Sequence, residues 1–487
     1  MEITNQVKNQ HLMWRAGFGP AAEQLTDLSK YKPSGYYKAL KKASAHEPVY
    51  INVADDTLID LYSQLQTPQK RQELGEMKRR EINRIQLDAR RMLNLYWLKE
   101  MVTTSAQLRE KMAFFWHGHF ASRNNNLFYN QLLLHVFRKY ALSDFRTLLK
   151  EVSQSAAMLY FLNNQQNRKG RPNENFAREV MELFTLGRGN YTESDIKEAA
   201  RAFTGWTANG RGEFVFRENF HDKGKKTVLG KTGNFTGEDI LDIILENKQT
   251  ARFITRKIYA FFVNDKIDDN ITERLAEQFY QSKYDIAALM ENIFTSDWFY
   301  HPQHIGAKIK SPVELLVGIQ RMIPMQLDND YALFNMQRIL GQQLLYPPNV
   351  AGWPGGKSWI DSSTLMMRMR IPQMFNDKDE LNISPKQDDD QMMGRKNDGS
   401  ANVPSKEAAG RRVYGSVNAK IDWKVYLGKY ESIQRDGLLK AIKGHLLQAT
   451  NPTIDNTVKA TIDSSSREAY IKSATVQLMS TPEYQLC

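Results

Sequence analysis

The sequence predicts a mainly α-helical protein with one small β-hairpin and a helical C-terminal extension. Most segments repeat apolar residues at the three- and four-residue spacing of an amphipathic helix, whereas alternating strand patterns are sparse. Of the 487 residues, 41% are hydrophobic and 25% are charged, which is ordinary for a globular protein. No apolar run reaches the ~18–20 residues that cross a bilayer, so we expect no transmembrane segment.

The predicted helices follow one another along the first three hundred residues. We expect them at residues 21–28, 58–65, 69–100, 106–116, 127–140, 143–162, 237–245, 250–263, 271–282 and 286–294. Residues 213–217 (EFVFR) and 227–229 carry the strand signals. Since a Gly- and Lys-rich segment separates these two, they are predicted to pair as the hairpin.

Residues 377–411 differ from the rest of the chain because they are polar and turn-rich, with few aromatic residues. Such a composition is typical of an exposed or disordered insertion. We therefore expect a main helical domain at residues 1–376, a disordered insertion at 377–420 and a helical segment at 421–487 that packs on the main domain.

Residues 173–206 (NENFAREVMELFTLGRGNYTESDIKEAARAFTGW) predict two amphipathic helices joined by a tight turn. Gly187 is a stop signal, and Thr192 with Asp195 forms a capping-box pattern. At 100° per residue, the apolar side chains of the first helix fall on one arc. The polar side chains fall on the opposite arc: Glu174, Asn175, Arg178, Glu179 and Glu182. This polar face is either a solvated surface with ion pairs along the helix or part of a site.

This stretch and four further blocks resemble the domain of unknown function 1800 family of bacterial proteins. The blocks are residues 11–19 (HLMWRAGFG), 115–120 (FWHGHF), 221–230 (HDKGKKTVLG) and 347–360 (PPNVAGWPGGKSWI). The resemblance covers nearly the whole chain outside the predicted insertion. It implies no established reaction, but it implies that the polar side chains of the blocks meet in one cleft. Relatives are often exported, although the N-terminus here lacks the apolar segment of a signal peptide.

Two histidines in the second block are candidate metal ligands. His117 and His119 would point about 200° apart on a helix, whereas on extended backbone they would share a face and bind one ion. His221 would complete the set, and imidazole ligands suit zinc or another divalent metal. The alternative is that His117 and His119 are ordinary capping or core residues among the neighbouring aromatics.

The third block supplies candidate catalytic residues. His221 is a candidate general acid/base, with Asp222 or Glu179 setting its tautomer. The resemblance places Glu179 on the same site. The alternative is that His221 and Asp222 form an ordinary turn before Gly224.

Four further residues are candidates for substrate binding. Arg178 and Lys226 would hold negative charge, and Asn175 belongs to the same polar set. Lys226 lies in a basic, Gly-punctuated segment that is either an anion cradle or a solvated loop. Trp353 would stack on a sugar ring or a partner, unless it anchors its own loop to the core.

These patterns lead to two expected functions. The first is a hydrolase, metal-assisted or general acid/base, that acts on an anionic substrate such as a polysaccharide or a phosphoester. Lys and Arg outnumber Asp and Glu by 66 to 55, which favours anionic ligands, while the lack of a nucleic-acid-binding motif disfavours DNA or RNA. The second is a non-catalytic scaffold, or partner, of an exported alkaline-phosphatase-like protein. That protein would belong to the domain of unknown function 1501 family, because relatives of this chain are often encoded beside members of that family.

Overall fold

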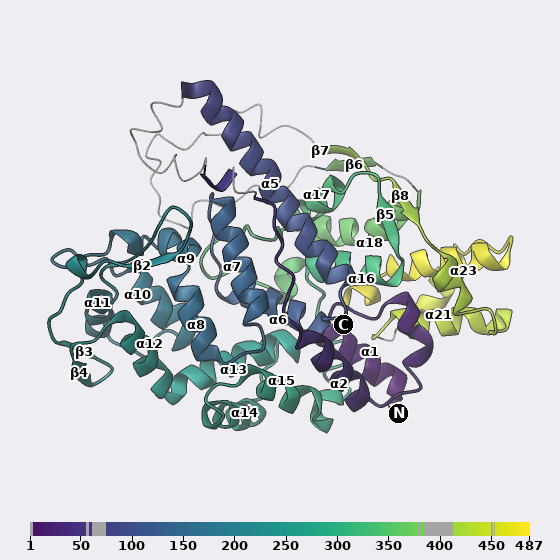
Figure 1. The fold of residues 1–487 in the computed structure, drawn as a ribbon. Helices are drawn as coiled ribbons and strands as arrows, with labels where there is room; N and C mark the ends of the chain where they lie inside the picture. The colour runs from purple at the N-terminus through teal and green to yellow at the C-terminus, as the bar shows by residue number, and fades with distance from the viewer. Residues whose placement is uncertain are drawn as a thin grey trace.

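The computed structural model describes residues 3–54, 58–60, 75–377, 380–383, 413–449, 451 and 453–487. This part of the chain is built mainly from helices, with four two-stranded sheets (Figure 1). The predicted mainly α class is therefore confirmed. Over the same residues, no helix is both long and apolar enough to cross a membrane.

The helices of the N-terminal half are α1 (Asn5–Arg15), α2 (Pro33–Ser44), α5 (Gly75–Thr103), α6 (Gln107–His119), α7 (Leu127–Lys139), α8 (Phe145–Gln154), α9 (Ala156–Phe161), α10 (Asn175–Glu179) and α11 (Glu193–Ala202). Most of them lie close to predicted positions, but α1 and α2 were not predicted, and the predicted helix at 21–28 is the 3₁₀ helix η1 (Ala22–Asp27). Ser155 divides the predicted helix at 143–162 into two, because its side chain accepts a bond from the Met158 N–H and starts α9. The predicted helix at 58–65 lies outside the described residues beyond residue 60.

The C-terminal half continues the helical pattern. Its helices are α12 (Gly237–Glu246), α13 (Lys248–Phe262), α14 (Asp269–Gln281), α15 (Ile286–Phe294), α16 (Pro312–Met322), α17 (Tyr331–Ile339), α18 (Ser362–Asp377), α20 (Lys424–Gly428), α21 (Leu438–Leu446), α22 (Ile454–Lys459) and α23 (Arg467–Met479). In Figure 1 the long α5 runs from the upper edge into the middle of the molecule, and α21 and α23 lie at the far right.

The predicted hairpin pairs differently from expectation. Both predicted strands exist, as β2 (Phe214–Phe216) and β3 (Lys226–Val228), but they do not pair with each other. β2 pairs with β1 (Trp206–Ala208), and β3 pairs with β4 (Lys231–Gly233), both antiparallel. The strand propensities were informative, whereas the choice of partner depends on the tight turns that flank each strand.

Two more small sheets lie near the predicted insertion. β5 (Met325–Leu327) pairs with β8 (Ala419–Ile421), and β6 (Glu380–Ile383) pairs with β7 (Val413–Ser416). The predicted disordered insertion lies for its greater part, residues 384–412, outside the described residues. The β6–β7 pair therefore brings the two ends of this segment together.

Helix α6 forms the centre of the core, because every one of its residues except Gly118 is buried. Its charged residues are paired, as buried charges must be. Glu110, which is fully buried, accepts bonds from Arg109, Arg138 and the Trp97 indole. Helices α2, α5 and α7 pack around α6. The ends of α6 are thus held at fixed positions, which matters for the side chains of its last turn.

The last described residues pack against the first helix. Arg15 donates to the carbonyls of His304 and Cys487 at 2.9 and 2.8 Å, and the Cys487 backbone pairs with that of Lys308. Gln10 of α1 donates to the Gly444 carbonyl at 2.8 Å. Cys487 is therefore buried.

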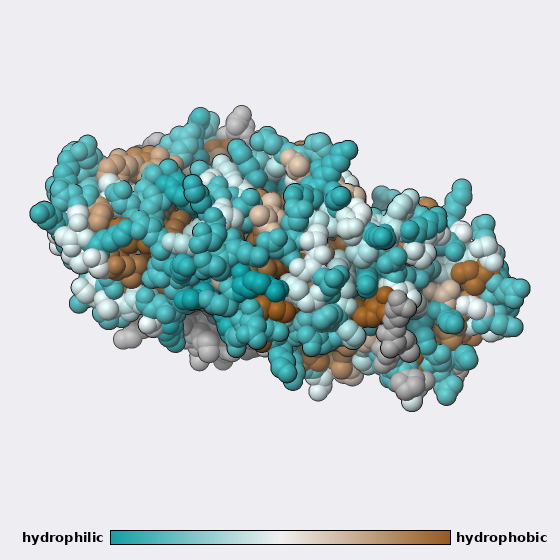
Figure 2. All heavy atoms as spheres, turned by 90° about the horizontal axis from the view of Figure 1, so that it is seen from below, coloured by the Kyte–Doolittle hydropathy of each residue, from teal (hydrophilic) through white to brown (hydrophobic). Residues whose placement is uncertain are grey.

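On the face shown in Figure 2, hydrophilic residues predominate and the hydrophobic patches are small and separate.

Candidate functional site

The stretch at residues 173–206 does not form two regular α-helices. α10 continues into a π-helical turn, η3 (Val180–Thr185), in which the Leu186 N–H donates to the Met181 carbonyl. Gly187 ends this turn at φ 79°, as its role as a stop signal predicted. π-turns within helices frequently occur at functional sites. The carbonyls at the end of η3 have no donors within the helix, so side chains from elsewhere can donate to them.

His119 and Lys257 bind these carbonyls. His119 Nε2 lies 3.0 Å from the Phe184 oxygen, and Lys257 Nζ donates to the Leu183 oxygen at 3.1 Å. Because a carbonyl only accepts, Nε2 of His119 carries the proton and Nδ1 is left as an acceptor. Nδ1 lies 3.3 Å from Lys257 Nζ. Burial, together with the Lys257 charge, lowers the pKa of His119, so its ring is neutral at pH 7.

Lys257, on α13, is a cation without a counter-ion among the described residues. None of the carboxylates in the described ranges lies within ion-pair distance of its ammonium group, which instead packs 4.8 Å from the Phe253 ring centroid. Burial lowers the pKa of Lys257 to about 8. An ammonium has three N–H donors, and Leu183 and His119 take two of them. The third is therefore left for a ligand.

Lys257 lines a cavity of about 320 Å³, and residues of two of the sequence blocks line it too. Its walls include Phe115 and His119 of α6, Lys257 and Phe261 of α13, and Trp353 and Trp359 around the Pro-Gly-Gly turn. The volume and the aromatic walls with convergent polar groups are typical of a small-molecule site.

The other charged groups of the cavity are paired. Lys308 forms an ion pair with Asp265 and also donates to the Ala260 carbonyl at 2.6 Å. Glu314 forms an ion pair with Lys111. Since these charges balance, Lys257 gives the cavity a net positive charge. The cavity thus favours an anionic ligand with an apolar or sugar-like body.

His117 is a core residue that packs against Trp353, one of the residues that line this cavity. It lies in the last turn of α6, where the helical alternative applies, so it faces away from His119. Its Nε2 accepts a bond from the Leu345 N–H at 3.0 Å, and burial lowers its pKa to about 3. The His117 ring packs on Trp353 with centroids 5.3 Å apart. Trp353 therefore anchors its loop to the core and also lines the cavity.

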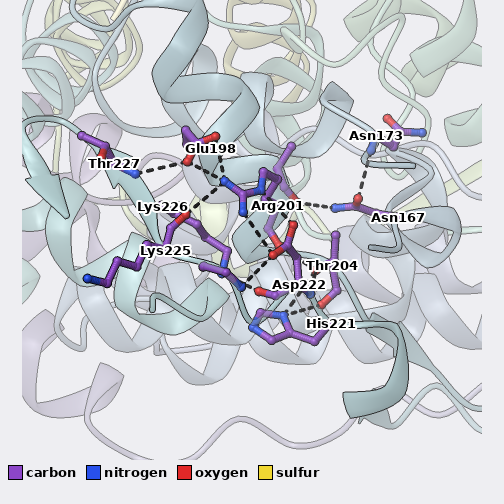
Figure 3. A network of polar contacts seen from close by, with 12 residues as sticks. Asn167, Asn173, Glu198, Arg201, Thr204, His221, Asp222, Lys225, Lys226 and Thr227 are labelled. Atoms are coloured by element: carbon purple, nitrogen blue, oxygen red, sulfur yellow. Dashed lines mark hydrogen bonds and ion pairs between the residues drawn. The ribbon is translucent and has the colours of Figure 1, made fainter. Parts of the chain in front are cut away.

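The third block forms a separate polar network around Arg201 (Figure 3). The Arg201 guanidinium donates to both Asp222 oxygens at 2.8 and 3.1 Å, and to Glu198. The bond from Arg201 lowers the pKa of Asp222 to about 2. Asp222 is thus committed to an ion pair, which is a poor state for a general base at neutral pH.

His221 and Lys226 belong to the same network (Figure 3). His221 Nδ1 lies 3.1 Å from the Thr204 carbonyl, so this carbonyl sets the tautomer, and neither Asp222 nor Glu179 does. Burial lowers the pKa of His221. The Lys226 side chain is buried, and its ammonium group donates to the carbonyls of Asp222 and Gly224. The turn alternative therefore describes His221 and Asp222, whereas the buried Lys226 fits neither the anion cradle nor the solvated loop.

The predicted single cleft is divided. Across the described ranges, no group of three His, Cys, Asp or Glu side chains is arranged to hold a metal ion, so His117, His119 and His221 do not form one ligand set. The reason is that α6 turns its two imidazoles to different partners, while His221 belongs to the Arg201 network.

The polar face of α10 is occupied by its own contacts. Arg178 forms ion pairs with Glu193 at 2.7 Å and Glu174 at 3.3 Å, and Asn175 donates to the Leu162 carbonyl. Glu179 has neither an ion pair nor a hydrogen bond to a described group, and burial raises its pKa. The surface alternative thus describes Arg178 well, whereas Glu179 stays a candidate for proton transfer.

Sequence reasoning missed Lys257, the residue that gives the cavity its charge. Lys257 lies three residues after Ile254 and four before Phe261, on a face of α13 that is largely apolar. A lysine between apolar residues at helical spacing was the available signal. It is weak because lysine stems often cover apolar surface with the ammonium group in water.

Comparison with known proteins identifies one family. The family described as "Protein of unknown function (DUF1800)" matches residues 11–486, which is nearly the whole chain. Neither the comparison with curated proteins nor that with solved structures found a match.

Proposed function

Because this chain belongs to the DUF1800 family of proteins of unknown function, we propose a function from its cavity: a hydrolase that binds an anionic substrate at Lys257. The observation that carries the proposal is a desolvated lysine with no counter-ion in the described part of the chain, held on His119 and lining an aromatic-walled cavity. Phosphoesters and acidic polysaccharides are the substrate classes that fit, since both join an anion to a body that packs on aromatic rings.

Lys257 would act first by binding the anion. Its free N–H donor supplies a charge-assisted hydrogen bond, which is stronger than a neutral one. Trp353 and Trp359 would hold the rest of the substrate against the Pro-Gly-Gly turn. A bound anion also raises the pKa of Lys257 above about 8, so the ammonium form dominates in the complex.

Lys257 would then act as the general acid. A lysine whose pKa lies near 8 is suited to proton transfer at neutral pH. As the bond to the leaving oxygen breaks, Lys257 gives that oxygen a proton, and His119 Nδ1 keeps the resulting amine in place. The attacking water passes its proton to solvent, because the two carboxylates on this cavity, Asp265 and Glu314, are held in ion pairs with Lys308 and Lys111. This scheme is hydrolysis with Lys257 as the general acid.

The test compares Lys257→Met with Lys248→Met. Both lysines lie on α13, but Lys248 is exposed and forms an ion pair with Glu277, so it controls for loss of a helix charge. Binding of inorganic phosphate is measured by calorimetry at pH 7, and hydrolysis is measured on p-nitrophenyl phosphate, bis-p-nitrophenyl phosphate and p-nitrophenyl glucuronide. We expect Lys257→Met to lose phosphate binding and about 10²–10⁴-fold in kcat on the substrate that wild type hydrolyses.

Two results would count against the proposal. Equal phosphate binding and equal turnover in wild type and Lys257→Met would remove the assigned role of this lysine. Phosphate binding that depends on Lys257, without hydrolysis of any of the three substrates, would instead favour the non-catalytic alternative.

A further inference from the structure

A second and larger cavity is separate from the Lys257 cavity. Its volume is about 720 Å³, and the residues that line it come from α1, α2, α6, α16, the end of α5 and the segment after Gly19. None of its lining residues belongs to the Lys257 cavity. Its volume lies within the range of small-molecule sites.

One wall of this cavity carries an arginine that has no counter-ion within the described ranges. Arg321 of α16 is only 7% exposed, and its Nε and Nη1 donate to the carbonyls of Gly19 and Val102 at 3.0 and 2.7 Å. No described carboxylate lies within ion-pair distance, and Nη2 donates to no described group. Arg321 is one of the residues that line the cavity. Burying a charge without an ion partner is costly, so an anion bound beside Arg321 would be favoured.

Two further donors face the same space. The Gln24 Oε1 accepts a bond from the Ala21 N–H, which leaves its amide NH₂ without a partner among the described groups, and the Ser105 hydroxyl has none either. The remaining walls are mainly apolar, with Met13, Tyr36, Leu40, Val102 and Met325 among them. The cavity therefore has one cationic group, Arg321, and mainly apolar walls.

We propose that this cavity binds a small amphipathic carboxylate. The planar Arg321 guanidinium, with Gln24 and Ser105, would hold the carboxylate head, because this fork matches a carboxylate in shape and charge. The aliphatic or aromatic body would lie on the apolar walls. A single unpaired cation suits a monoanion, whereas a phosphate dianion would need further positive charge.

Glu23 lies on the same cavity and opposes this ligand. Attraction to its carboxylate raises the pKa of Arg321 against the larger effect of burial, but the two groups form no ion pair. Glu23 is exposed to solvent, so water screens its charge. Glu23 therefore weakens ligand binding but does not replace the ligand as the partner of Arg321. Removing the charge of Glu23 should consequently strengthen binding, whereas removing the charge of Arg321 should weaken it.

The test uses the full chain and three probes of one length. Decanoate, decanol and decylamine share an apolar chain and differ in the head group, and their binding is measured by calorimetry at pH 7. We expect decanoate to bind at least tenfold more tightly than decanol, and decylamine not to bind. Arg321→Met should weaken decanoate binding tenfold or more, whereas Glu23→Gln should strengthen it severalfold.

Arg321 also donates to two main-chain carbonyls, so Arg321→Met can fail to fold. Ala43→Trp provides a second variant, because it fills the cavity from α2 and leaves those bonds intact. We expect Ala43→Trp to abolish decanoate binding while the melting temperature stays near that of wild type. Equal affinity for decanoate and decanol, or normal decanoate binding in a folded Ala43→Trp, would overturn the proposal. Loss of decanoate binding in Lys257→Met would also overturn it, because the ligand would then occupy the other cavity.

Discussion

The charge on Lys257 makes a measurable contribution to the pH dependence of folding. In the folded protein burial lowers the pKa of Lys257 from 10.5 to about 8. Between these two values the unfolded chain binds more protons at this site than the folded chain does. The free energy of unfolding therefore rises with pH across this window, by about 3 kcal/mol for a shift of this size. Below pH 8 both states are protonated and the full cost of the buried ammonium remains.

Replacing Lys257 with methionine removes this titration. The variant keeps a side chain of similar length, and it leaves the Leu183 carbonyl without its donor, which costs about 1–3 kcal/mol at every pH. The difference in unfolding free energy, wild type minus variant, should therefore change with pH. We expect it to grow by about 3 kcal/mol between pH 7.5 and 10.5, with the steepest change above pH 8.

Urea unfolding at a series of pH values, followed by circular dichroism, measures this difference. Other titrating groups, such as the buried tyrosines, contribute equally to both proteins and cancel. Lys248→Met should give a nearly constant difference from wild type, because Lys248 is exposed. A flat curve for Lys257→Met would refute the reasoning, since it would mean that Lys257 has an ordinary pKa and is not desolvated.

Three other predictions concern the framework around the sites. Asp222→Asn should cost about 2 kcal/mol of stability at pH 7, and this wild-type contribution should disappear as pH falls from 3.8 towards 2; unfolding in urea at pH 7 and at pH 2.5 checks it. Gly205→Ala should cost about 2 kcal/mol or more, seen as a lower melting temperature, because Gly205 has φ 84° and a Cβ would lie 2.6 Å from the Arg217 oxygen. Glu110→Gln should cost about 1–3 kcal/mol in urea unfolding, because it leaves the buried Arg109 and Arg138 with only the partly exposed Glu100 as their anion, and a loss below 1 kcal/mol would contradict that role.

Helical periodicity located most helices well because it reports burial of one face. α15 (Ile286–Phe294) begins and ends where predicted, and α13 differs by only one or two residues from the predicted 250–263. The π-helical turn after Glu179 was not predictable in the same way. Its apolar residues fit a regular helix, and the wider turn depends on partners such as His119 that come from distant sequence.

The candidate site was predictable only in part. His119 and Trp353 were identified because their blocks carry unusual residue types, and both line the Lys257 cavity. Lys257 was missed because a lysine on an amphipathic helix is usually solvated. The predicted link between His119 and His221 failed because residue spacing does not specify which neighbours a helix end will meet. Strand pairing failed for the same reason, since β2 and β3 each found a nearer partner.

The contacts between the first helix and the last residues set the order in which this chain can fold. Arg15 binds the Cys487 carbonyl 472 positions away, and Gln10 binds the Gly444 carbonyl 434 positions away. At synthesis rates of about 5–20 residues per second, α1 waits roughly 25–95 seconds for its partners to be made. During that time its apolar face and the Arg15 guanidinium have no native partner at the C-terminal end. A newly made N-terminal region therefore leaves the surface of α1 unburied, and this part of the core is completed only after residue 487 has been made.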